Sequence, residues 1–137
     1  MSRLARKGSR IDGASIPQVL WSTGGPYEGK YRDASVIHDV YCDEAPKTRT
    51  WQAVHRMFYD GMLASGVADT RALFMYGAVY RHGPKWPDPA RAEAGEVLPP
   101  APPNMDEDLR RLEALVNSGQ VTTVNQVEAL PLVIPPA

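Results

Sequence analysis

Proline is the residue that most limits how this chain can fold, and its distribution is uneven. Ten of the thirteen prolines lie from Pro84 onward, and four of them fall within residues 99–103. Proline fixes its own φ angle and has no amide hydrogen to donate, so it is excluded from helix interiors and central strands. We therefore predict a domain over residues 1–87, a semi-rigid proline-rich linker over 88–104 and a C-terminal segment over 105–137.

The length and composition limit the kind of protein this is. A chain of 137 residues can bury one modest hydrophobic core. Its formal net charge of −1 gives no overall attraction to nucleic acid, so no nucleic-acid partner is expected. No run of about eighteen apolar residues occurs, and the basic N-terminus lacks the apolar stretch of a secretory signal. We expect a cytoplasmic protein with no transmembrane segment and no signal peptide.

Apolar residues at helical spacing predict a mainly α fold. The first part of the chain is expected to form a small domain of about three helices, over about 33–42, 50–65 and 69–81, after an irregular N-terminal segment. Asp33 is the expected N-terminal cap of the first helix. Gly66 is expected to end the second helix, because glycine tolerates the left-handed conformation found there.

Two histidines interrupt the apolar stripes of the first two predicted helices. His38 precedes the loop between these helices by one turn, and His55 follows the loop by one turn. At about 1.5 Å of rise per residue, both stand roughly 6 Å from the loop. If the helices pack antiparallel, the two imidazoles lie at matching height and face one another.

This pattern is typical of either a general base or a metal site. A neutral imidazole suits both roles near neutral pH. We predict catalytic roles for His38, His55 and Asp12, and a divalent metal bound by His38, Asp39 and His55. The spacing leaves zinc and calcium equally open. Cys42, the only cysteine, shares a helix face with His38, but a solitary thiol is usually a small core residue.

Several motifs occur in order over residues 8–87: Asp12-Gly13-Ala14-Ser15-Ile16-Pro17, Tyr27-Glu28-Gly29-Lys30-Tyr31-Arg32, Val36-Ile37-His38-Asp39, Val54-His55-Arg56-Met57-Phe58-Tyr59, and Met75-Tyr76 with Ala78-Val79. This combination resembles the domain of unknown function 1353 family, which is common in bacteriophages and proteobacteria. Members of that family carry a D-x-A-S-[IV]-P loop followed by a helical His-Asp pair. The resemblance implies a family but no reaction.

The His-Asp helix is also similar, more loosely, to the helix pair of secreted phospholipase A2. That resemblance implies that His38 activates water and that Asp39 binds the cation. His55 stands where those lipases have an orienting aspartate, and their glycine-rich calcium loop and disulfides are missing. An unspecified hydrolase is therefore favoured over lipid hydrolysis.

Three functions remain open at this point. The leading interpretation is a small metal-assisted hydrolase, in which His38, Asp39 and His55 activate water with help from Asp12. The alternative is a non-catalytic interaction protein of phage or prophage origin, in which the same residues form a buried polar network. A third is an antibacterial effector delivered by a phage or a secretion machine.

The C-terminal segment is predicted to be a docking arm. Asn104 is the expected cap of a helix over 105–117, and an isolated helix of this length is marginal in water. Its apolar stripe is therefore expected to dock on its own domain, on a second copy of the chain or on a protein partner. Residues 121–124 are β-prone, and residues 130–136 are expected to be extended. The stripe consists of Leu109, Leu112, Leu115 and Val116.

Overall fold

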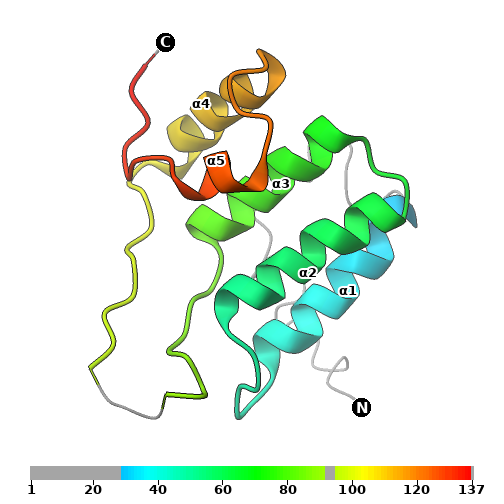
Figure 1. The fold of residues 1–137 in the computed structure, drawn as a ribbon, viewed down its shortest axis with the longest axis vertical. Coiled ribbons are helices and arrows are strands. Elements are labelled where there is room, and N and C mark those ends of the chain that lie inside the picture. The colour runs from blue at the N-terminus through cyan, green and yellow to red at the C-terminus, as the bar shows by residue number, and fades with distance from the viewer. Residues whose placement is uncertain (1–28, 92–94, 137) are drawn as a thin grey trace.

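The computed structural model describes residues 29–91 and 95–136. Within these residues the chain forms five helices and no strand, which confirms the mainly α fold (Figure 1). The helices are α1 (Gly29–Asp43), α2 (Trp51–Ala64), α3 (Asp69–His82), α4 (Met105–Asn117) and α5 (Val124–Glu128). None of them is both long and apolar enough to cross a membrane.

Three of the other helices pack against α3, and the remaining one, α1, packs against α2. The first two, α1 and α2, lie side by side and run antiparallel, and α3 packs against α2 (Figure 1). The last two, α4 and α5, both pack against α3. The third helix is therefore the element that joins the first two helices to the last two.

Local capping explains several of the helix ends. The Thr50 hydroxyl accepts a hydrogen bond from the amide of Ala53 at 3.1 Å, which satisfies a free donor at the start of α2. Gly66 has φ +92° and follows the end of α2, as predicted. The Asn104 side chain accepts a hydrogen bond from the amide of Glu107, so the predicted cap of α4 is confirmed.

Two details of the predicted secondary structure are wrong. The first helix begins at Gly29, so Asp33 lies inside α1 and does not cap it. An aspartate inside a helix costs less than about 1 kcal/mol, so a cap-type residue does not force a helix to begin there.

The second correction concerns the β-prone stretch at 121–124. Thr123 caps α5, and Thr123 and Gln126 form a reciprocal capping box. Val124 and Val127 face the core from this helix. The Thr-x-x-Gln spacing is a helix-start signal that outweighs the β propensity of the valines, since that propensity mainly reflects packing.

The main hydrophobic core is built around α3. Most residues of α3 are buried, because α2 covers one side and α4 and α5 cover another. The stripe of α4 packs into the same core through Leu109, Leu112 and Val116. Gly77 permits this close approach, since a Cβ there would lie 2.8 Å from Leu112. The stripe therefore docks on its own chain; association with a second copy and separability of residues 105–137 stay predictions.

A buried ion pair also links α3 to the C-terminal segment. Arg81 donates to both carboxylate oxygens of Asp108 at 2.8 and 2.9 Å, and to the carbonyl oxygens of Pro131 and Leu132. His82 lies 2.7 Å from Asp108. Burial alone would raise the pKa of Asp108, but hydrogen bonds from His82 and Arg81 lower it.

We predict that Leu112→Ala lowers the free energy of unfolding by about 2–5 kcal/mol, because it leaves a cavity in the core between α3 and α4. The matched control is Leu132→Ala, whose side chain is 47% exposed and should cost about 1 kcal/mol or less. Urea unfolding followed by circular dichroism measures both. Equal effects of the two substitutions would contradict the assignment of Leu112 to the core.

Candidate metal centre

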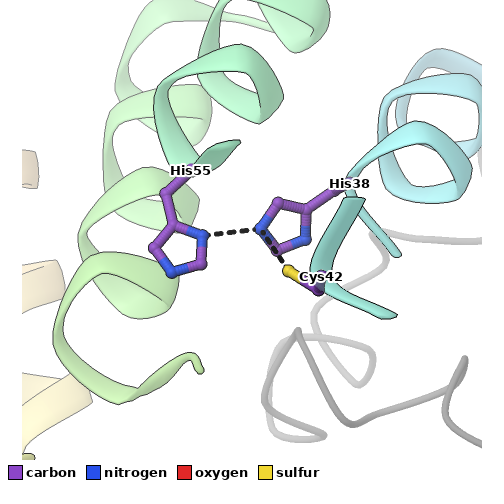
Figure 2. Close-up of side chains that lie close together, drawn as sticks. All are labelled: His38, Cys42 and His55. Carbon is purple, nitrogen blue, oxygen red and sulfur yellow. Dashed lines mark hydrogen bonds between the residues drawn. The ribbon is translucent and has the colours of Figure 1, made fainter. Parts of the chain in front are cut away.

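The antiparallel packing of α1 and α2 brings the two predicted histidines together. The distance from Nε2 of His38 to Nδ1 of His55 is 2.8 Å, which is a hydrogen bond (Figure 2). Both side chains are buried. The expectation that the imidazoles face one another at matching height is confirmed.

The structure adds Cys42 to this pair. Cys42 lies one turn after His38 on α1, and its Sγ is 3.7 Å from Nε2 of His38 (Figure 2). One possible ligand atom from each of His38, Cys42 and His55 lies within 4.8 Å of the others, and we call these residues the His–Cys–His cluster. The sequence already carried this signal, because residues four apart share a helix face.

The predicted carboxylates are placed differently. Asp39 follows His38 on α1 and is partly buried, but it is not one of the three residues of the cluster. Its role as a metal ligand stays a prediction. Asp12 lies outside the residues that the structure describes, so its catalytic role also stays a prediction.

The hydrogen bonds assign the ring protons. Nε2 of His55 lies 2.9 Å from the carbonyl oxygen of Pro84, which can only accept, so this nitrogen carries a hydrogen. In a neutral His55 the other nitrogen, Nδ1, is then an acceptor, and Nε2 of His38 must donate to it. Nδ1 of His38 is consequently left with a lone pair, buried and without a hydrogen-bond partner among residues 29–91 and 95–136.

The surroundings keep both histidines neutral. Burial, followed by the neighbouring His55, holds the pKa of His38 well below its ordinary value. Burial also lowers the pKa of His55 to about 4, although the hydrogen bond to Pro84 opposes this shift. At neutral pH both rings therefore offer lone pairs, which metal binding requires.

Aromatic rings enclose the cluster. The ring of Phe58 lies 4.9 Å from that of His38, and the rings of Trp51 and Trp86 lie 5.7 and 6.4 Å from that of His55. The indole N–H of Trp86 donates to the carbonyl of Arg49 at 2.7 Å. Contact with these rings contributes to the burial of both histidines, and burial in apolar surroundings is the main cause of the lowered pKa values.

No pattern in the sequence predicts how His55 is held in place. The carbonyl of Pro84, which follows the end of α3, accepts from the ring of His55 and fixes its orientation. A Cβ on Gly83 would lie 2.5 Å from the carbonyl oxygen of Val79 and 3.3 Å from Nε2 of His55. Glycine is therefore needed where the chain passes this close to His55.

A family model agrees with the earlier resemblance. The model for DUF1353, a protein of unknown function, matches residues 2–79. The chain belongs to the DUF1353 family. The matched residues include all three members of the His–Cys–His cluster, whereas Pro84 lies beyond them.

Two relatives of this DUF1353 protein come from Sinorhizobium fredii (strain NBRC 101917 / NGR234). The uncharacterized protein y4jT is 55% identical over 80 residues, which cover 58% of this chain and 23% of y4jT. The uncharacterized protein y4iH is 49% identical over 81 residues, which cover 58% of this chain and 33% of y4iH. The chain thus spans a quarter to a third of the length of these relatives. No solved structure matches it.

The family match and the two relatives say nothing about the reaction or the origin of the protein. The family description and the names of the two relatives state no reaction and mention neither phospholipase nor phage. The phospholipase likeness, the phage origin and delivery by a secretion machine therefore stay predictions.

The lowered pKa values of His38 and His55 predict that the stability of the fold depends on pH. In metal-free protein, the unfolded chain takes up protons on its histidines below pH 6.5, whereas folded His55 does so only near pH 4. The free energy of unfolding should therefore fall as the pH drops from 6.5 to 4.5, by about 2–3 kcal/mol for His55 alone.

Thermal unfolding at a series of pH values, with chelator present, measures this effect. The control is His55→Gln, which cannot titrate in this range and should show a shallower slope than the wild type. Identical slopes for the two proteins would show that His55 is not held neutral by the fold.

Proposed function

We propose that this protein is a small metal-dependent hydrolase that holds a zinc ion, or a similar divalent transition-metal ion, on His38, Cys42 and His55. The observation that carries the proposal is the convergence of two nitrogen ligands and one sulfur ligand from adjacent helices, all buried and within 4.8 Å. Three protein ligands leave a fourth tetrahedral position for water, as in catalytic zinc sites.

The distances support a tetrahedral ion. Zinc bonds of 2.0–2.1 Å to nitrogen and about 2.3 Å to sulfur imply ligand separations of about 3.3 Å between nitrogens and about 3.6 Å between nitrogen and sulfur. The separation of Cys42 Sγ and His38 Nε2, at 3.7 Å, already fits. The two imidazoles, at 2.8 Å, need to part by about 0.5 Å to admit the ion.

The hydrogen-bond pattern also supports metal binding. Nε2 of His55 donates to the Pro84 carbonyl and leaves Nδ1 available, an arrangement typical of histidine ligands in metal sites. His38 must release the proton from Nε2 to bind through that nitrogen. Its partnerless Nδ1 is a position that can accept this proton.

The donor set favours zinc over calcium. Calcium takes oxygen ligands, whereas imidazole and thiolate suit zinc. Zinc lowers the pKa of a bound water to about 7 and polarises a carbonyl or phosphoryl oxygen of the substrate. Asp12 keeps its predicted role as the carboxylate that assists. Asp39 stays a predicted oxygen ligand, which would make the ion five-coordinate when water is also bound.

A second candidate is favoured by the same hydrogen bonds. The hydrogen bonds from His38 through His55 to Pro84 join α1, α2 and the segment that follows α3. In that case the cluster holds the helices together, and the protein acts as a non-catalytic interaction protein.

Metal content tests the proposal. Elemental analysis of the purified protein should find about one zinc ion per chain, and His38→Ala and Cys42→Ser should each lose most of it. His82→Ala is the matched control, because His82 contacts Asp108 instead of the cluster. Wild-type protein that holds no metal and shows no thermal shift with added zinc would refute the metal site.

Stability and activity separate the two candidates. If the site is a metal centre, zinc at 100 times its Kd should stabilise the protein by about 2.7 kcal/mol, and chelation should abolish hydrolysis of activated esters such as p-nitrophenyl acetate. If the cluster is only a polar network, zinc changes nothing and His55→Ala costs about 1–3 kcal/mol in metal-free protein. Calorimetry and an absorbance assay provide both measurements.

A further inference from the structure

A pocket of about 300 Å³ lies next to the rings that enclose the cluster. Trp51 lines this pocket, and its ring lies 5.7 Å from the ring of His55. The ring of Tyr80, 5.1 Å from that of Trp51, continues the aromatic wall. Pro99, Pro100 and Pro102 of the linker complete much of the apolar lining.

Lys85 places a cation in this apolar lining. Its ammonium lies 5.2 Å from the centre of the Trp51 ring and donates to the carbonyl of Arg81 at 3.2 Å. No carboxylate in the described part of the chain lies within ion-pair distance of it. Burial, and then the charge of Arg81, lower the pKa of Lys85.

The other charged groups of the lining are already engaged. The guanidinium of Arg81 pairs with Asp108. The carboxylate of Glu128 is exposed to solvent and accepts a hydrogen bond of 2.6 Å from the Tyr76 hydroxyl. An ammonium has three donors, and Lys85 gives one of them to Arg81. Lys85 is thus the charged group of the described lining that remains available to a ligand.

We propose that this pocket binds a small organic carboxylate, with its apolar body against Trp51, Tyr80 and the linker prolines and its carboxylate on Lys85. Apolar walls with one or a few placed polar groups are the usual design of a small-molecule site. A carboxylate supplies a counter-charge that Lys85 does not find among residues 29–91 and 95–136, and charge-assisted hydrogen bonds are the stronger kind. The proposal does not depend on the metal centre, because none of the three cluster residues lines the pocket.

Isothermal titration calorimetry on the full chain, with chelator present, tests this binding. The probes are benzoate and hexanoate, with the uncharged benzamide and hexanamide as matched controls. We expect saturable binding of at least one acid, and binding of its amide at least about tenfold weaker, because the amide carries no charge for Lys85. No saturable binding of either acid, or equal binding of acid and amide, would overturn the proposal.

Substitutions of residues that line the pocket test whether the acid binds there. Lys85→Met should weaken binding of the acid about tenfold or more, whereas Arg110→Met, which removes the same charge from an exposed position on α4, should leave it unchanged. Leu132→Trp should block the pocket by filling it, and it keeps the hydrogen bond from Arg81, which goes to the backbone of residue 132. Unchanged affinity in both Lys85→Met and Leu132→Trp would overturn the proposal. If Lys85→Met fails to fold, the result with Leu132→Trp decides.

Discussion

The structure depends on the burial of α3 from more than one side. Phe74, Met75, Tyr76 and Val79 are all buried, and no single neighbouring helix can cover side chains that point in so many directions. This helix therefore needs α2 on one side and the C-terminal helices on another. Because α3 must be covered on this second side, the chain comes back to it after the proline-rich connection. Arg81 of α3 and Asp108 of α4 form their ion pair where the C-terminal helices meet α3.

Much of the fold follows from local sequence signals. Thr50, Gly66 and Asn104 mark helix ends with side-chain or backbone chemistry that does not depend on the rest of the chain. The pattern at 121–124 favours a strand, because valine and threonine favour strands in general. Burial of Val127 and the Thr123–Gln126 capping box produce a helix at 124–128 instead. The docking of α4 on α3 depends on Gly77, and the sequence alone does not show that this glycine faces Leu112.

Part of the candidate site was also predictable from local sequence signals. The position of His38 and His55, one turn from either side of a short loop, fixes their height when two helices pack antiparallel, so their contact follows from the spacing. The choice of Cys42 over Asp39 also follows from the spacing, because a residue four positions after His38 shares its helix face and the next residue does not. The acceptor of His55 comes from Pro84, 29 residues later, and no local pattern indicates such a contact.

The group that fixes His55 belongs to the backbone, and this has a consequence for how the site can vary. A carbonyl oxygen is present whatever residue occupies position 84, so side-chain changes there leave the acceptor in place. An insertion or deletion between His82 and Trp86 would instead move the oxygen away from the ring and release its orientation. The site is thus protected against point changes at its anchor and vulnerable to changes in the length of the chain there. The hydrogen bond from Trp86 to the Arg49 carbonyl holds the far end of this segment in place, so the segment between His82 and Trp86 has a set length.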